Sequence, residues 1–303
     1  MRDTLEYVLF SIIYRLAQRL SFRSAERVGA MLGELVFACT QIRKKVTLDN
    51  LAHAFPEKSP DELRHIARGA YRNYGIAVLL FMWSTNKSAE VLKSLVRFTN
   101  PEVLHHALER KRGVLFLSAH FGAWELLSAS IRLHVGATVS ALVQRQRNPK
   151  IDALLDAHRR RFGNDTIPMG VSSRRVLTAL ADNHVVILLG DQSGPKEAVF
   201  VEFFGRPAAT HRGVAAFSLK SGAPIVMGFL VRQRDATYTM TLEEVEQHDL
   251  GAYTEENILE LTRRHVAILE RWIRHYPDHW LWMHKRWKHT TYYQEHLAET
   301  EHS

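Results

Sequence analysis

Two short, strongly apolar segments limit the folds that this chain can adopt. They are VLFLSA at 114–119 and HVVILLG at 184–190. Strands of this kind are buried on both faces, which is typical of a parallel sheet between layers of helices. A polar residue follows each segment directly, His120 after the first and Asp191 after the second. If the two strands are parallel neighbours, both side chains emerge at the carboxyl edge of one sheet, where open α/β sheets place their binding sites.

Helices alternate with strands over the rest of the chain. SPDE at 59–62 is a capping-box pattern, with Ser59 as N-cap and Glu62 reaching back, and it predicts a helix through residue 83. The second half of this helix is apolar nearly all round, which predicts deep burial or contact with lipid. Further predicted elements are helices at 150–162, 173–182, from Thr210 as N-cap to near 222 and at 255–275, an edge strand at 198–205, and two strands within 223–246. We therefore predict an α/β fold with a mixed, largely parallel central sheet flanked by helices.

A helical region precedes the predicted sheet. LEYVLFSIIY at 5–14 is apolar apart from Glu6, a second apolar stretch covers 28–42, and arginines or lysines follow both. Apolar helices with basic flanks bind the membrane interface, where anionic lipids attract the basic residues. We therefore predict membrane-associating helices over 1–45 and an α/β domain over 46–303. The alternatives are two core helices of a soluble domain, or a span by the first helix, although the stretch is short for one.

The chain carries a net charge of +8 and has a pI near 9.6. Such a surface suits anionic partners, namely nucleic acids, acidic carrier proteins, and phosphate or anionic lipid head groups. Its single cysteine, Cys39, allows no internal disulfide and no cysteine-based metal cluster. The cysteine content therefore fits a reducing compartment.

The turn after the first apolar segment, HFGAWE at 120–125, contains residue types that suit acid–base chemistry. Gly122 lets the chain bend sharply into a helix, and Glu125 then falls in the first helical turn, where the helix dipole favours a carboxylate. We expect Glu125 to turn back toward the imidazole of His120, fixing its tautomer and raising the basicity of the other ring nitrogen. The pair therefore predicts a base that takes a proton from an alcohol. The alternative is a turn with two unrelated polar residues.

The motifs of several other reaction classes are missing from the sequence. No Gly-x-Ser-x-Gly elbow lies on a strand and Cys39 lies in the N-terminal helices, so a covalent acyl-enzyme lacks a nucleophile. No Walker loop and no Gly-x-Gly-x-x-Gly motif occurs, and we expect no cofactor. We also expect no metal site, because no zinc signature matches the spacing of His265, His275, His279, His284 and His289. A His–Glu pair without a nucleophile suits direct attack by a substrate hydroxyl on an activated acyl group.

HFGAWE also matches the His-x4-Asp/Glu box of glycerolipid-type acyltransferases, in its Glu form. With its other segments the chain resembles the bacterial lipid A biosynthesis late acyltransferases, the lauroyl and myristoyl transferases. The resemblance covers nearly the whole chain, and the order and spacing of its segments make it specific. These segments are DNLAHAFPEKSPDELRHIARGAYRNYG (49–75), HFGAWELL (120–127), ALVQRQRNPKID (141–152), DQSGPKEAVFVEFFGRPAAT (191–210), SGAPIV (221–226) and PDHWLWMHKRWK (277–288).

The resemblance implies a membrane-associated enzyme at the cytoplasmic face of the cell inner membrane. It implies that an acyl group moves from acyl carrier protein, or from coenzyme A in some relatives, to a hydroxyl of a glycolipid. In the lipid A branch this hydroxyl belongs to a 3-hydroxyacyl chain on a phosphorylated glucosamine disaccharide. His120 would be the general base and Glu125 its orienting partner. Arg145 matches a family arginine just ahead of an Asn-Pro pair and would hold an anion, either a phosphate or the thioester oxyanion.

Asp191 matches the acidic residue that the family carries after the second core strand, and we include it among the substrate-binding candidates. The family often has another acidic residue shortly after it, whereas this chain has Gln192 and Ser193. This difference argues against a metal or an extra acid–base role for the loop, and it leaves open a different acceptor.

Arg206, His284 and Arg286 complete the predicted substrate-binding residues. Arg206 is a candidate phosphate contact, with a surface arginine in a loop as the alternative. His284 and Arg286 alternate with Trp280 and Trp282 in the C-terminal WLWMHKRWK, a pattern that fits a membrane–water interface or phosphate contacts. The alternative for this segment is a last strand with a buried aromatic face.

Three hypotheses follow from the sequence. The first is a glycolipid O-acyltransferase that acts on lipid A precursors. The second is an acyltransferase for another membrane lipid, or a thioesterase in which water replaces the alcohol. The third is a non-catalytic, basic membrane-binding protein. We expect no nucleic-acid partner, because the basic and aromatic residues that could serve one lie in a tail rather than across a recognisable fold.

Overall fold

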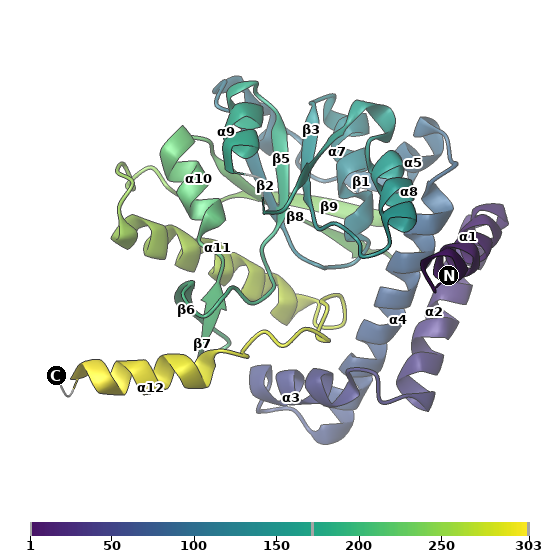
Figure 1. Cartoon of the computed structure of the whole chain (residues 1–303), viewed down its shortest axis with the longest axis horizontal. Coiled ribbons are helices and arrows are strands. Elements are labelled where there is room, and N and C mark those ends of the chain that lie inside the picture. Colours follow the sequence, from purple (N-terminus) through teal and green to yellow (C-terminus); the bar gives the residue numbers. More distant parts are fainter. Residues whose placement is uncertain (1, 171–172, 302–303) are drawn as a thin grey trace.

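A seven-stranded sheet lies at the centre of the computed structural model, which describes residues 2–170 and 173–301, and of residues 296–301 only the backbone (Figure 1). The strand order is β1-β9-β8-β2-β5-β3-β4. The strands are β1 (Val96–Phe98), β2 (Val114–Ser118), β3 (Val139–Val143), β4 (Asp165–Pro168), β5 (Val185–Leu189), β8 (Ile225–Arg232) and β9 (Tyr238–Glu244). The surrounding helices include α1 (Arg2–Arg19), α2 (Phe22–Cys39), α3 (Lys44–Ala54), α4 (Pro60–Ser84), α5 (Ala89–Leu95), α6 (Glu102–Glu109) and α7 (Leu127–Val135).

The strands β8, β2, β5, β3 and β4 run parallel, while β9 is antiparallel to β8 and β1 is parallel to β9. The predicted mixed, largely parallel sheet is therefore confirmed. The two apolar segments are neighbours, with Ser118 of β2 opposite Leu189 of β5. Since parallel neighbours end at the same edge, this register brings His120 and Asp191 together, as the sequence predicted.

Alternate residues of β2 pack into two separate cores, because helices cover both faces of the sheet. Leu115 and Leu117 belong to a core that includes residues of α9 (Ser173–Ala181), α10 (Gly213–Ser221) and α11 (Glu255–His275). Val114 and Phe116 face the other core, with residues of α4, α6 and α7. All five residues of β2 are buried, so a charged side chain is tolerated only after the strand ends.

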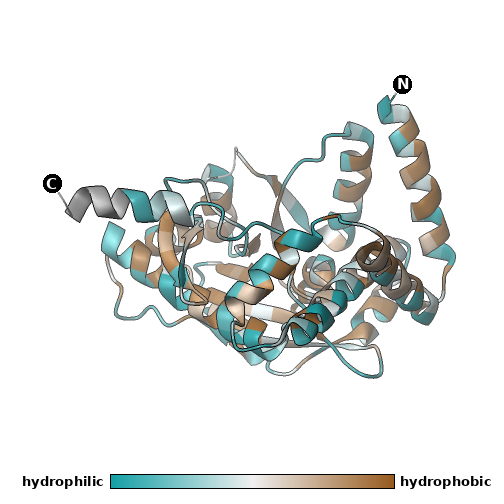
Figure 2. Cartoon of the chain, turned by 90° about the horizontal axis from the view of Figure 1, so that it is seen from below, coloured by the Kyte–Doolittle hydropathy of each residue, from teal (hydrophilic) through white to brown (hydrophobic). Residues whose placement is uncertain are grey.

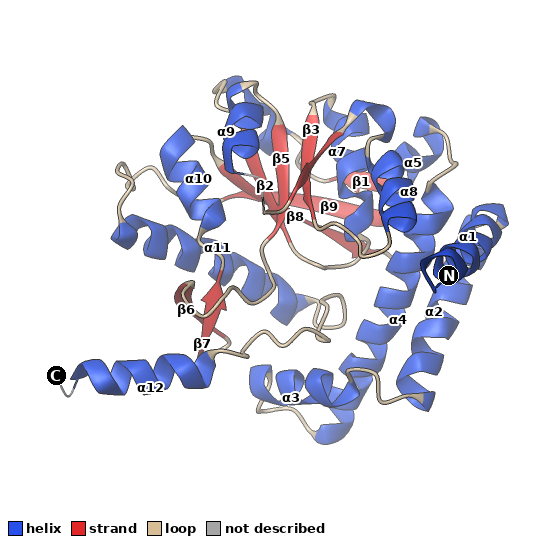
Figure 3. Ribbon diagram, viewed as in Figure 1, coloured by secondary structure: helices blue, strands red, loops and turns tan. Residues whose placement is uncertain are grey.

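Most predicted elements are present, and two differ from the prediction. The capping box of α4 forms as expected, and the second half of α4 is buried. The segment 198–205 is not an edge strand of the sheet, because β6 (Val199–Phe203) pairs with β7 (Arg206–Thr210) in a separate antiparallel hairpin (Figure 3). The N-cap of α10 is Arg212, since Thr210 ends β7 and its hydroxyl bonds the carbonyl of Ala208. The remaining helices are α8 (Pro149–Arg159) and α12 (Thr290–Glu301), and short 3₁₀ turns cover Trp124–Leu126 and Arg161–Gly163.

The helices α2 and α4 approach each other at backbone distance. A Cβ added to Gly33 would lie 2.1 Å from the carbonyl oxygen of Tyr71, and one added to Gly29 would lie 2.6 Å from that of Gly75. Gly75 is equally close to the backbone of Gly29. Side chains at these positions would hold the two helices apart, so the crossing depends on glycine.

The helix α1 presents one apolar face to the outside. Tyr14 and Ala17 are buried against Leu79 and Met82 of α4. The exposed large apolar residues of α1 form a helical stripe, and they are Leu5, Val8, Leu9, Ile12, Ile13 and Leu16. Apolar residues run along this helix in Figure 2. Among the helices over residues 2–170 and 173–301, none has both the length and the apolar content needed to cross a membrane.

We predict that Gly33→Ala lowers the free energy of unfolding by about 1–3 kcal/mol, because the new methyl group would overlap the backbone of α4. Chemical denaturation followed by circular dichroism measures this change. Gly251→Ala is the control, since a Cβ at Gly251 meets no atom within 4 Å. An equal, small effect of both substitutions would contradict the close crossing.

Candidate active site

The turn that carries His120 is fixed by glycine geometry and by the C-terminal segment. Gly122 has a φ of +56°, and a Cβ on it would lie 1.9 Å from the carbonyl oxygen of Leu230. The backbone N–H of Gly122 donates to the carbonyl of His279 at 2.9 Å, and the N–H of Leu281 donates to the carbonyl of His120 at 3.0 Å. The sharp bend predicted at Gly122 is therefore confirmed, and it leads into the 3₁₀ turn and then α7.

Asp191 holds the imidazole of His120. Its Oδ1 lies 2.9 Å from Nδ1 of His120, and its Oδ2 accepts the backbone N–H of His120 at 3.1 Å. Oδ2 also accepts the indole N–H of Trp280 at 3.0 Å. Because an ionised carboxylate can only accept, Nδ1 carries a proton and Nε2 of the neutral ring keeps its lone pair. No described residue hydrogen-bonds to Nε2, so this nitrogen can accept a proton from a bound molecule.

The electrostatics of this pair favour its charged forms. Burial disfavours the ionised carboxylate of Asp191, but the charge and hydrogen bond of His120 and the N–H donors outweigh burial and lower the pKa of Asp191. Burial also opposes protonation of His120, yet the charges of Asp191 and Glu125 raise the pKa of His120 above its usual value. Asp191 thus makes His120 a stronger base than a free imidazole.

Glu125 is not the hydrogen-bonding partner of His120 that the sequence analysis expected. Its carboxylate lies against the guanidinium of Arg159 on α8, with Oε1 2.8 Å from Nη2 and Oε2 3.4 Å from Nε. Asp191 occupies the Nδ1 side of the ring, and the paired arginine offers Glu125 two donors. Glu125 acts on His120 through its charge.

A cavity of about 730 Å³ opens beside these residues. His120, Trp124 and Glu125 line it, and the ring of Trp124 lies 5.4 Å from that of His120. Much of the remaining lining is apolar and comes from β3, β5, α7, α10 and the loops near them. These residues include Leu127, Ala141, Leu142, Val143, Phe162, Met169, Ile187, Leu188, Leu189, Val214 and Phe217. A cavity of this size and lining suits a molecule with a long apolar part.

Arg145 and His284 lie near this site without lining the cavity. Arg145 is exposed in the loop after β3, between Gln144 and Gln146, which do line it. Nε2 of His284 accepts the backbone N–H of Ser193, two residues after Asp191, at 3.0 Å. Burial lowers the pKa of His284 and so favours its neutral ring. Because Nε2 accepts a hydrogen bond, the proton of this neutral ring is on Nδ1. Both residues are placed at the edge of the site.

The structure does not bring Arg206 and Arg286 to the cavity. Arg206 is exposed at the turn of the β6–β7 hairpin, whereas the cavity reaches the other end of this hairpin at Ala198. Arg286 is fully buried and donates to the carbonyl of Ala209 and to the hydroxyl of Thr210. Burial lowers the pKa of Arg286 to about 10. Its predicted phosphate contact is wrong, because aromatic residues and β7 enclose its side chain.

The C-terminal tryptophans also differ from an interfacial belt. Trp280 and Trp282 are 1% and 0% exposed, so neither reaches a membrane surface. The buried aromatic face considered as the alternative is present, but as an irregular segment with one bridge between Trp280 and Phe121 rather than a strand. Sequence reasoning missed the bond from Trp280 to Asp191 and the pairing of Arg159 with Glu125. Arg159 stands in a run of three arginines at 159–161, and nothing in that run singles it out.

Comparison with known proteins identifies the family of this chain. The family described as "Bacterial lipid A biosynthesis acyltransferase" matches residues 2–289. The chain is 25% identical to "Lipid A biosynthesis lauroyltransferase" of Escherichia coli K12, over 86% of this chain and 84% of that protein. It is 24% identical to "Lipid A biosynthesis palmitoleoyltransferase" of the same strain over the same shares, and 24% identical to "Lipid A biosynthesis acyltransferase 2" of Shigella flexneri, over 86% of this chain and 81% of that protein. The match over nearly its whole length shows that the chain is an acyltransferase of the bacterial lipid A biosynthesis acyltransferase family.

Proposed function

We propose that this protein moves a fatty acyl group from an acyl thioester to a hydroxyl of a lipid A precursor, with His120 as the general base. The observation that carries the proposal is the Asp191–His120 pair at the edge of an apolar cavity, with Nε2 of His120 unpaired among the described residues. The names of the relatives support the substrate class.

The proposed reaction is a direct transfer. Nε2 of His120 takes the proton of the acceptor hydroxyl as its oxygen attacks the thioester carbonyl. The carbon–sulfur bond breaks, the ester forms, and the leaving thiolate takes the proton from His120. Asp191 keeps the proton on Nδ1 and stabilises the imidazolium between the two steps. No enzyme nucleophile is needed.

The apolar lining of the cavity is proposed to hold the acyl chain, with its carbonyl near Trp124 and His120. Arg145 and the Nδ1–H of His284 are proposed to hold anionic groups of donor or acceptor at the edge of the site. Glu125, paired with Arg159, is proposed to add negative charge close to the imidazolium. Arg206 is proposed to contact a group of the substrate that lies outside the cavity.

We propose that the enzyme works at the cytoplasmic face of the cell inner membrane, with residues 1–45 as its membrane-associating part. Support comes from the apolar stripe of α1 and from four exposed arginines of α1 and α2, namely Arg15, Arg19, Arg23 and Arg27. Such a surface binds the interface of an anionic bilayer. The net charge of +8 also suits an acidic acyl carrier protein as donor, with acyl-CoA as the other candidate.

The first prediction is that purified protein adds one acyl group to a tetraacyl lipid A precursor supplied with an acyl-carrier thioester. His120→Ala should lower this rate by about 10²–10⁴-fold, because the base is lost. Mass spectrometry of the lipid products measures it, with His248→Ala as the control for loss of a histidine elsewhere. Release of free fatty acid alone would instead identify a thioesterase, and equal rates for wild type and His120→Ala would contradict the role of His120.

The second prediction concerns the pH dependence of kcat/KM. Neutral His120 is the active form, and Asp191 raises its pKa, so the rate should rise with pH through a limb above about 6.5. Asp191→Asn should move this limb to lower pH and lower the plateau by about 10²–10⁴-fold, because the tautomer is no longer fixed. Glu125→Gln should move the limb less, since Glu125 bonds Arg159. If Asp191→Asn leaves the pH at which kcat/KM rises unchanged, Asp191 is not the residue that raises the pKa of His120.

The third prediction is that α1 binds anionic vesicles through its stripe. Leu9→Glu with Ile13→Glu should abolish flotation with vesicles that contain phosphatidylglycerol, since it places charge in the apolar face. Val91→Glu with Tyr253→Glu, at exposed apolar positions elsewhere, is the matched control. Equal flotation of both variants would show that α1 is not the docking helix.

A further inference from the structure

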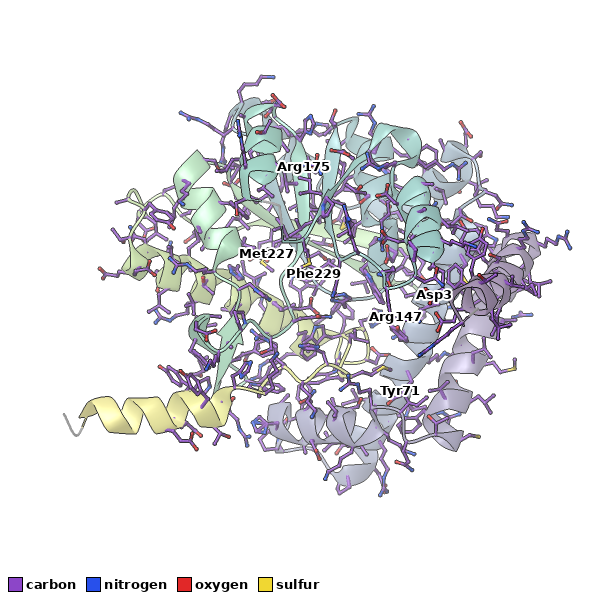
Figure 4. The ribbon with its side chains drawn as sticks, in the orientation of Figure 1. Asp3, Tyr71, Arg147, Arg175, Met227 and Phe229 are labelled. Carbon is purple, nitrogen blue, oxygen red and sulfur yellow. The ribbon has the colours of Figure 1, made fainter. Side chains whose placement is uncertain are left out.

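The polar side of α1 contacts the loop between β3 and α8, and Gln146 of this loop lines the cavity. Arg147 pairs with Asp3 at 3.3 Å and with Glu6 at 2.5 Å. Asp3 and Arg147 lie side by side in Figure 4. The ammonium group of Lys150 lies over the ring of Tyr7 at 5.7 Å. Exposed ion pairs contribute little one at a time, so the strength of this contact depends on what lies beneath them.

Beneath the ion pairs lies Asn148, which is 4% exposed and serves two helices at once. Its Oδ1 caps α8 by accepting the backbone N–H of Lys150 at 3.1 Å. Its amide nitrogen donates to the carbonyl of Asp3 in the first turn of α1 at 2.7 Å. The start of α8 is therefore hydrogen-bonded to the start of α1 through one side chain.

The helix α8 is held by single side chains rather than by a buried face. Its Asp156 accepts a hydrogen bond from Thr166 of β4, and Nε2 of its His158 lies 3.3 Å from the hydroxyl oxygen of Ser84 on α4. None of its residues, all of which the structure describes, is fully buried. Leu154 packs against the cluster that Tyr14 and Ala17 of α1 form with Leu79 and Met82 of α4.

At the other end of α8, His158 and Arg159 line the cavity. Arg159 is the partner of Glu125, whose charge acts on His120. An 11-residue helix without a fully buried residue depends on these side-chain contacts for its position.

We propose that α8 couples lipid docking to acyl transfer: an anionic bilayer bound by α1 fixes α8 through Asn148 and Arg147, and α8 then holds Arg159 against Glu125 at the reaction site. The inference rests on the proposed function. The stripe of α1 lies on a face other than the one that carries Asp3 and Glu6, so lipid and α8 bind α1 together. When lipid has already restricted the motion of α1, α1 loses less conformational entropy on contact with α8, so the contact between α1 and α8 becomes stronger. Asn148 and Arg147 are positioning residues, because neither touches His120.

Hydrogen exchange on the wild-type protein tests the coupling without any assay of activity. We expect amides of residues 149–159 to exchange more slowly with vesicles of phosphatidylglycerol and phosphatidylethanolamine than with vesicles of phosphatidylcholine alone. The amides of α9, which lies away from α1, serve as the internal reference. Unchanged exchange in 149–159 when the protein is bound to the anionic vesicles would overturn the proposal.

A conservative variant removes the hydrogen bond from Asn148 to Asp3 and keeps the N-cap of α8. Asn148→Asp keeps an N-cap oxygen for α8, but its carboxylate cannot donate to the carbonyl of Asp3. We expect normal flotation with anionic vesicles, loss of the slowed exchange in 149–159, and a transfer rate on vesicles that is about fivefold lower, as for one lost hydrogen bond. Asn257→Asp is the matched control, since its amide also donates to a backbone carbonyl, that of Ala252.

The outcomes separate the two proposals. Normal transfer by wild type together with a wild-type rate for Asn148→Asp on vesicles would overturn the coupling and leave the proposed function intact. Slowed exchange of 149–159 in a protein that transfers no acyl group would support the coupling of α8 to lipid and reject the proposed function. If Asn148→Asp does not fold, Arg147→Gln takes its place, and retention of the wild-type rate by Arg147→Gln would again count against the coupling.

Discussion

The candidate active site depends on one buried charge. Asp191 is 2% exposed, and an ionised carboxylate at that depth persists only when donors replace the water that it loses. These donors are the ring and backbone of His120 and the indole of Trp280, which belong to segments far apart in the sequence. The carboxylate thus joins the ends of β2 and β5 to the C-terminal segment, and each of the three helps to fix the direction in which the imidazole points.

Sequence reasoning predicted the sheet and the meeting of His120 with Asp191 because both follow from local pattern and strand direction. Two apolar strands, the capping box at Ser59 and the bend at Gly122 each carry their own signal. It assigned the wrong carboxylate to His120, because Glu125 is five residues away in sequence and Asp191 is 71, and distance along the chain says nothing about which acid reaches Nδ1.

The C-terminal segment was harder to predict for a similar reason. Its alternating tryptophans and cations fit a membrane surface, yet Trp280, Trp282 and Arg286 are enclosed by β7 and by the aromatic rings around it. A pattern of residue types records what can contact water or lipid, whereas burial is decided by elements that arrive from elsewhere in the chain. The pairing of Arg159 with Glu125 likewise required the position of α8.

The glycine crossing of α2 and α4 has a consequence if the protein acts at a membrane, as we propose. Burial of large apolar side chains drives association only while water surrounds the alternative state. The contact through Gly29, Gly33 and Gly75 instead brings backbone atoms within van der Waals distance. Such attraction does not depend on the expulsion of water, and it holds helices together inside bilayers as well. The crossing of α2 and α4 should therefore keep its geometry in water and in hydrocarbon alike.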